Sequence, residues 1–198
     1  MNWQLDQYDL RPIGFDIKLY LTALGVDLTF LKRQYEYSRG GTSIHAKAGD
    51  VVIDAGSCYG DTALYFAHQV GPQGRVFGFE FIGENLEILN RNLELNPPLS
   101  KRIEVVEAPL WETSGKVLYC VDNGPSSRVS DEPTEGAQEI KTLSIDDLVC
   151  STESLSSRSN QDGHRGRGAF SFERCCQADS TSQAYSCCLR LPSTFGLD

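Results

Sequence analysis

The sequence has little positive charge. Its 198 residues include 18 lysines and arginines against 27 aspartates and glutamates, which gives a formal net charge of -9. A protein that binds phosphate backbones needs a basic surface, so this balance argues against a nucleic-acid partner. We therefore expect a small substrate or one carried by another protein, and we interpret most of the negative charge as an aid to solubility.

Long apolar runs are also missing. Residues 1–10 carry no basic flank and no apolar stretch, so they do not resemble a targeting signal. The stretch 17–31 is fairly apolar, but Lys18 and Asp27 interrupt it and it is too short to span a membrane. We therefore predict a cytoplasmic location with no membrane partner, and an amphipathic or buried role for this stretch.

The cysteines do not have the spacing of a zinc site. The chain has seven cysteines, among them two adjacent pairs, and no two CxxC units. Without a secretory signal, a disulfide framework is not expected either. The sequence therefore predicts no metal site.

The composition changes near Val149. Before this position apolar runs alternate with helical patterns, and after it serine is enriched, lysine is absent and neither period persists. We predict an N-terminal helical or mixed cap over residues 1–48, with residues 15–37 mostly helical or mixed. A half-domain with regular secondary structure is predicted to follow over residues 49–149. Residues 150–198 are predicted to form an irregular, disordered tail.

Strands and helices alternate through residues 49–149. The first strand is apolar on both faces, which is typical of the middle of a covered parallel sheet. The predicted strands are 50–54, 75–81, 103–107, 116–121 and 139–143, and the predicted helices are 61–70 and 84–96. This order predicts an α/β fold with a doubly wound, mostly parallel sheet.

A glycine-containing loop, DAGSCYG at 54–60, joins the first strand to the first helix. Gly56 permits a sharp turn, and Gly60 permits a close approach of the helix to the strand and to a ligand. Glu80 ends the second strand. Because the ends of neighbouring parallel strands lie side by side, its carboxylate can accept hydrogen bonds from both hydroxyls of a ribose. Ala108 follows the third strand and is placed to border an adenine.

These segments resemble class I methyltransferases, and among them the FkbM family of O-methyltransferases. The resemblance covers about half of the chain. It rests on VVIDAGSCYGDTALYFA at 51–67, VFGFEF at 76–81, IEVVEAPLWETSG at 103–115, GPSSRVS at 124–130 and KTLSIDDLV at 141–149.

The resemblance implies S-adenosyl-L-methionine as cofactor and a hydroxyl of a small molecule or sugar as methyl acceptor. By this resemblance Asp54, Gly56 and Gly60 form the wall for the amino-acid part of the cofactor, and Glu80 binds its ribose. Cys58 stands where many methyltransferases have a glycine. The resemblance does not identify a catalytic base, and the sequence does not reveal the oligomeric state.

An NAD-binding Rossmann protein is the competing interpretation. Its fingerprint G-x-G-x-x-G is absent, because Cys58 occupies the place of the second glycine. An ordinary turn in an α/β protein would also explain a lone glycine loop. The acidic strand end and the downstream segments favour the methyltransferase over both.

A family hallmark of the type IKMDIEGAEL is expected soon after residues 141–149, and the sequence has NQDGHRGRGAF at 160–170 instead. One permitted set of codons for 160–170, read one base later, encodes that hallmark. The residues present fix or nearly fix the first and third bases of each shifted codon, so chance is a poor explanation. We hypothesise a frameshift near Val149 or Cys150, which would make the product marginally stable and weak or inactive, a non-catalytic remnant.

Overall fold

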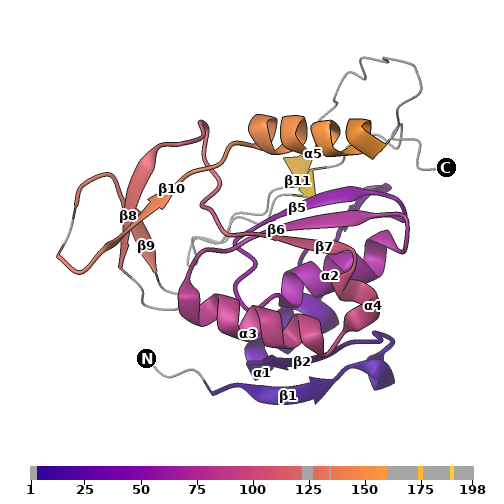
Figure 1. Cartoon of the computed structure of the whole chain (residues 1–198). Coiled ribbons are helices and arrows are strands. Elements are labelled where there is room, and N and C mark those ends of the chain that lie inside the picture. Colours follow the sequence, from indigo (N-terminus) through magenta and orange to yellow (C-terminus); the bar gives the residue numbers. More distant parts are fainter. Residues whose placement is uncertain (1–3, 122–126, 134, 160–173, 176–187, 190–198) are drawn as a thin grey trace.

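The computed structural model describes residues 4–121, 127–133 and 135–159, together with the short strands at 174–175 and 188–189. A three-stranded parallel sheet lies at its centre, in the order β5-β6-β7 (Figure 1). Its strands are β5 (Val51–Ala55), β6 (Arg75–Phe79) and β7 (Ile103–Val106). The predicted α/β class with a parallel sheet is therefore confirmed.

Helices cover both faces of this sheet (Figure 1). On one face lie α2 (Asp61–Val70), α3 (Gly83–Glu94) and the short α4 (Pro97–Ser100). On the other face α5 (Ile145–Ser159) contributes Leu148 to a cluster with strand residues such as Phe77. Among the helices of the described residues, none has the length and apolar character needed to cross a membrane.

The strands predicted near 116–121 and 139–143 exist, but they do not extend the parallel sheet. β8 (Val117–Val121), β9 (Arg128–Ser130) and β10 (Gln138–Lys141) form a separate antiparallel sheet. In β8 only Leu118 and Cys120 are buried, so the strand is covered on one face. Such alternation is typical of antiparallel strands, whereas every residue of β5 is buried or half-buried.

Helix α5 crosses the predicted domain boundary at residues 149 and 150. The Ser144 hydroxyl accepts a hydrogen bond from the Asp147 backbone N–H at 3.2 Å, which caps the helix as its sequence predicts. With no proline or glycine before Ser159, nothing stops the helix at Val149. The prediction of irregular structure is therefore wrong for residues 150–159. The proposed hallmark segment 160–170 lies outside the described residues.

The N-terminal segment is mixed, as predicted, but it is less helical than expected. Two antiparallel hairpins flank a short helical stretch, and the exposed and buried residues of β2 alternate as in a strand. The elements are β1 (Asp6–Asp9), η1 (Arg11–Ile13), β2 (Lys18–Leu21), α1 (Ala23–Val26), η2 (Asp27–Leu31), β3 (Tyr37–Arg39) and β4 (Thr42–Ile44).

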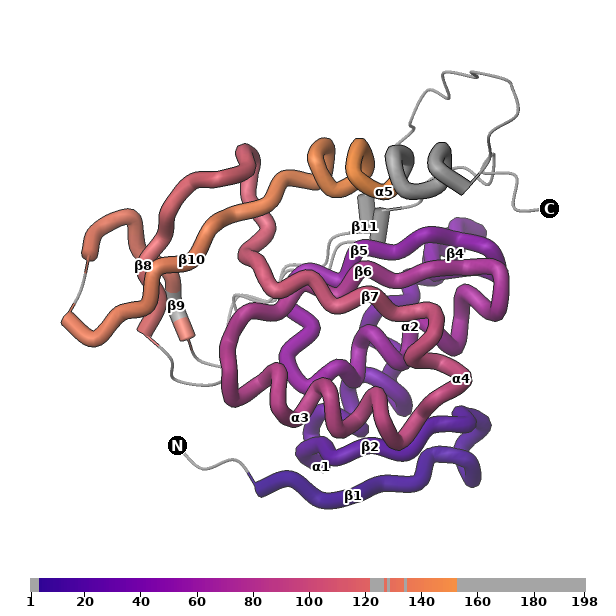
Figure 2. Tube along the Cα trace, viewed as in Figure 1, coloured from indigo at the N-terminus to yellow at the C-terminus, as the bar shows by residue number. Residues whose placement is uncertain are grey.

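Two asparagines, one within α3 and one just after its C-terminal end, bind the N-terminal hairpin to the rest of the fold. The buried Asn92 side chain accepts a hydrogen bond from Tyr20 N–H at 2.6 Å and donates to Tyr20 C=O at 3.0 Å. Asn96 makes the same pair of bonds with Lys18, at 2.9 and 2.6 Å. The amides thus pair with β2 as a neighbouring strand would, and β2 runs beside α3 (Figure 2).

Replacing Asn92 with alanine should lower the free energy of unfolding by about 2–3 kcal/mol, because it leaves buried backbone groups without partners. Urea denaturation measures this change. Asn90→Ala is the matched control, since Asn90 is an exposed asparagine on the same helix. Equal stability losses in the two variants would contradict the role given to Asn92.

Candidate functional site

The loop at 56–60 is bonded to the end of the neighbouring strand. The backbone N–H groups of Gly56 and Ser57 both donate to the carbonyl of Phe79, at 3.0 and 2.9 Å. Gly56 adopts a left-handed conformation with φ 92°, which favours glycine. Phe79 precedes Glu80, so the loop and the acidic strand end lie together, as the sequence predicted.

Gly60 has a different role from Gly56. A Cβ on Gly60 would lie 3.1 Å from the Leu89 Cγ of α3, and Gly60 has φ 78°. Gly60 therefore allows α3 to pack against the loop. The sequence analysis missed Gly78 of β6, where a Cβ would lie 2.7 Å from the Ser57 Oγ and prevent the loop from closing over the strand.

Glu80 is buried and its carboxylate is held by its own surroundings. One oxygen, Oε1, accepts hydrogen bonds from the N–H groups of Phe81 and Ile82 at 2.7 and 2.8 Å. Burial raises the pKa of this carboxyl, while these bonds and a bond from the Cys58 backbone N–H lower it. Glu80 directly follows Phe79, whose carbonyl accepts the two hydrogen bonds from the glycine loop.

Asn85 is a site residue that the sequence analysis missed. Its Nδ2 donates to the second carboxylate oxygen of Glu80, Oε2, at 3.1 Å. Asn85 is 3% exposed, and its Oδ1 has no hydrogen-bond partner in the described part of the chain. A buried acceptor beside a carboxylate therefore remains available for a donor.

Asp54 lies underneath the loop. Its Oδ2 accepts hydrogen bonds from the hydroxyls of Ser57, at 2.9 Å, and Thr62, at 2.5 Å. The side chain is fully buried. Asp54 therefore ties the loop to the start of α2, which gives it a positioning role beside the cofactor contact that the resemblance implies.

Asp61, the first residue of α2, is a second buried carboxylate that the sequence analysis missed. It accepts a hydrogen bond from the Thr29 hydroxyl of η2 at 2.9 Å. Burial raises its pKa to about 6, and the Asp54 charge adds to this, while bonds from Thr29 and from the backbone N–H groups of Asp61 and Thr62 oppose it. A buried carboxylate at the start of α2 disfavours a phosphate there, because like charges repel.

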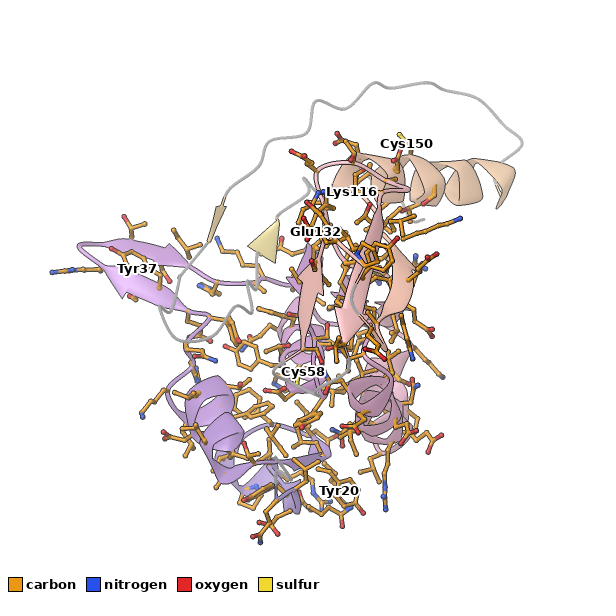
Figure 3. The ribbon with its side chains drawn as sticks, turned by 90° about the vertical axis from the view of Figure 1, so that its left-hand side faces the viewer. Tyr20, Tyr37, Cys58, Lys116, Glu132 and Cys150 are labelled. Carbon is orange, nitrogen blue, oxygen red and sulfur yellow. The ribbon has the colours of Figure 1, made fainter. Side chains whose placement is uncertain are left out.

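Cys58 is not a nucleophile in this loop. Burial raises the pKa of its thiol, and the charges of Asp61, Glu80 and Asp54 raise it further, so the thiol stays protonated. Figure 3 places Cys58 among packed side chains in the middle of the molecule. Its φ of 45° lies in the left-handed region, which favours glycine over residues that carry a side chain.

Ala108 lies at the same edge of the sheet. It is half-buried, and its N–H donates to the carbonyl of Val106 at 2.9 Å. The N–H of Glu80 donates to the same carbonyl at 3.1 Å. The ends of β5, β6 and β7 therefore bring together Gly56, Glu80 and Ala108.

Comparisons with known proteins give partial matches. No family model and no curated protein matches the sequence. Among solved structures, a putative rRNA-methylase from Clostridium thermocellum is 34% identical over 32% of this chain and 34% of its own, with a TM-score of 0.30. A protein-L-isoaspartate O-methyltransferase is 21% identical over 35% of this chain and 26% of its own, with a TM-score of 0.28.

A third structure is fibrillarin from Aeropyrum pernix, in complex with natively bound S-adenosyl-L-methionine. It is 17% identical over 54% of this chain and 56% of its own, with a TM-score of 0.29. The chain thus spans between about a quarter and somewhat over half of the length of these three proteins.

The left-handed backbone at Cys58 can be tested with two variants that both remove the thiol. Cys58→Gly should be more stable than Cys58→Ala by about 1 kcal/mol, because alanine retains the steric cost of the left-handed conformation and glycine does not. Thermal and urea unfolding measure the difference. An alanine variant at least as stable as the glycine variant would contradict the strain at this position.

Proposed function

We propose that this chain carries the cofactor-binding half of a methyltransferase that uses S-adenosyl-L-methionine and methylates a hydroxyl oxygen of a small molecule or sugar. The observation that carries the proposal is the junction of β5 and β6. Gly56 and Ser57 donate to the carbonyl of Phe79, the residue before Glu80, at the carboxyl edge of a parallel sheet. Open α/β sheets bind ligands at this edge.

The charge at this edge favours a cationic ligand. In the part of the chain that the structure describes, no basic side chain lies within 4.0 Å of the carboxylates of Glu80 and Asp61, because the ion pairs all lie elsewhere. No group of three potential metal ligands was found among these residues. S-adenosylmethionine carries a sulfonium and an ammonium, whereas the pyrophosphate of NAD is negative and would be repelled.

The residues of the chain would bind and orient the cofactor. Glu80 offers carboxylate oxygens to the two ribose hydroxyls, and Gly56 leaves room for the chain to turn beside the ligand. The bound cofactor supplies an activated methyl group. Methyl transfer would require the acceptor hydroxyl to be held in line with that methyl group and a base to take the hydroxyl proton.

A non-catalytic remnant is the second candidate. The sequence at 160–170 favours it, because a shifted reading frame restores the family hallmark there. We propose that this frameshift removed the strand that would follow α5 in an intact enzyme. A carboxyl-edge site needs neighbouring strands on both sides of the switch point, so the loss would weaken cofactor binding and abolish turnover.

Two chains distinguish the candidates, the present sequence and one in which the alternative frame is restored from Cys150 onward. Calorimetric titration with S-adenosylmethionine should give micromolar affinity for the restored chain and weaker binding for the present one, and only the restored chain should release thioether product with hydroxyl acceptors. Tight binding of NAD with no binding of S-adenosylmethionine by either chain would refute the proposal. Codons incompatible with the alternative frame would refute the frameshift.

Glu80→Gln in the restored chain should weaken S-adenosylmethionine binding by about tenfold or more, because the amide loses both the charge and one acceptor oxygen. Calorimetry measures the dissociation constant. Glu104→Gln, at an exposed glutamate on β7, is the matched control and should bind as the parent does. Unchanged affinity in the Glu80 variant would remove Glu80 from the site.

A further inference from the structure

We propose that Asp61, held by Thr29, is a specificity-determining residue of the proposed cofactor site. Its negative charge favours the sulfonium cofactor over the uncharged thioether that remains after methyl transfer. This inference rests on the proposed function and assigns a role to a residue outside the motifs that suggested it.

The position of Asp61 supports this role. It follows Gly60 directly, and burial leaves it 9% exposed. Asp54 of β5 and Cys58 of the loop are the titratable groups that interact with it, and from η2 it meets the uncharged hydroxyl of Thr29. Since no cation of the described residues is paired with it, the carboxylate is a buried charge without a counter-ion.

A second observation points to a ligand beside the same loop, where Cys58 interacts with the charges of both Asp61 and Glu80. Asn85 is 3% exposed and keeps an unpartnered Oδ1 while its Nδ2 binds Glu80. Buried acceptors without donors are rare in folded proteins. The acceptor of Asn85 and the charge of Asp61, which has no counter-ion among the described residues, both suit a ligand that brings donors and positive charge.

A purely structural role would not need the charge. An asparagine at position 61 would still accept the Thr29 hydrogen bond, and it would avoid the cost of a buried carboxylate beside Asp54. Charges that oppose stability occur preferentially at functional sites. Burial raises the folded-state pKa of Asp61 to about 6. The charged carboxylate therefore lowers the folding stability fully above that pH, and this destabilisation disappears as the pH falls below the ordinary pKa of an aspartate.

The test compares affinities of the full chain for S-adenosylmethionine and S-adenosylhomocysteine by calorimetry between about pH 5 and about pH 8. In the parent chain the preference for S-adenosylmethionine should rise as the pH passes upward through the pKa of Asp61. Asp61→Asn should reduce the preference at about pH 8 by about tenfold and abolish its pH dependence. The same variant, without ligand, should unfold at a higher temperature than the parent at about pH 8.

Thr29 variants test the positioning role. Thr29→Val removes the hydroxyl that lowers the pKa of Asp61. The rise in the preference for S-adenosylmethionine should therefore occur at a higher pH in this variant. Thr29→Ser keeps a hydroxyl and should return the rise to the pH found for the parent. Asp50→Asn is the matched control, a buried carboxylate at the opposite end of β5, and should leave the preference unchanged.

An unchanged preference in Asp61→Asn, with both ligands still bound, would overturn this inference and leave the proposed function standing. If Asp61→Asn fails to fold, the inference would be overturned by a Thr29→Val variant whose preference for S-adenosylmethionine rises at the same pH as that of the parent. Failure of the parent chain and of the frame-restored chain to bind either ligand would overturn the proposed function and this inference together.

Discussion

The site depends on two backbone hydrogen bonds. When Gly56 and Ser57 donate to the carbonyl of Phe79, the loop after β5 closes over the end of β6. This closure needs left-handed backbone at Gly56 and the absence of a side chain at Gly78. Once the loop is closed, it lies against the strand end that leads into Glu80, so the acidic group and the glycine turn become one unit.

Much of this unit could be predicted from the sequence. The apolar strand at 50–54, the glycines and Glu80 follow local rules of strand, turn and helix, and the helix at 61–70 has the bounds that its pattern gives. The supporting residues could not be found in this way. Asn85 and Thr29 matter because of the carboxylates they meet in space, and Thr29 lies far from Asp61 in the sequence.

The wrong predictions share a physical cause. β8 is buried on one face only and pairs antiparallel with β9 and β10, so these strands do not join the parallel sheet. Serine enrichment suggested that structure ends at Val149, yet a good N-cap at Ser144 and a stretch free of breakers extend α5 through Ser159. Composition describes a whole segment, whereas a helix end depends on a few residues.

The asparagine pairing of β2 has a consequence for self-association. A two-stranded hairpin has two open edges, and each can pair with the edge of another molecule. The amides of Asn92 and Asn96 occupy the edge of β2 with side chains instead of a strand. The remaining edge belongs to β1, which carries the exposed charge of Asp6 and the ion pairs of Asp9 with Arg11 and Lys18. Charged side chains on an edge strand disfavour pairing with another strand. The hairpin is therefore guarded against edge-to-edge aggregation on both sides, by amide pairing on one and by charged side chains on the other.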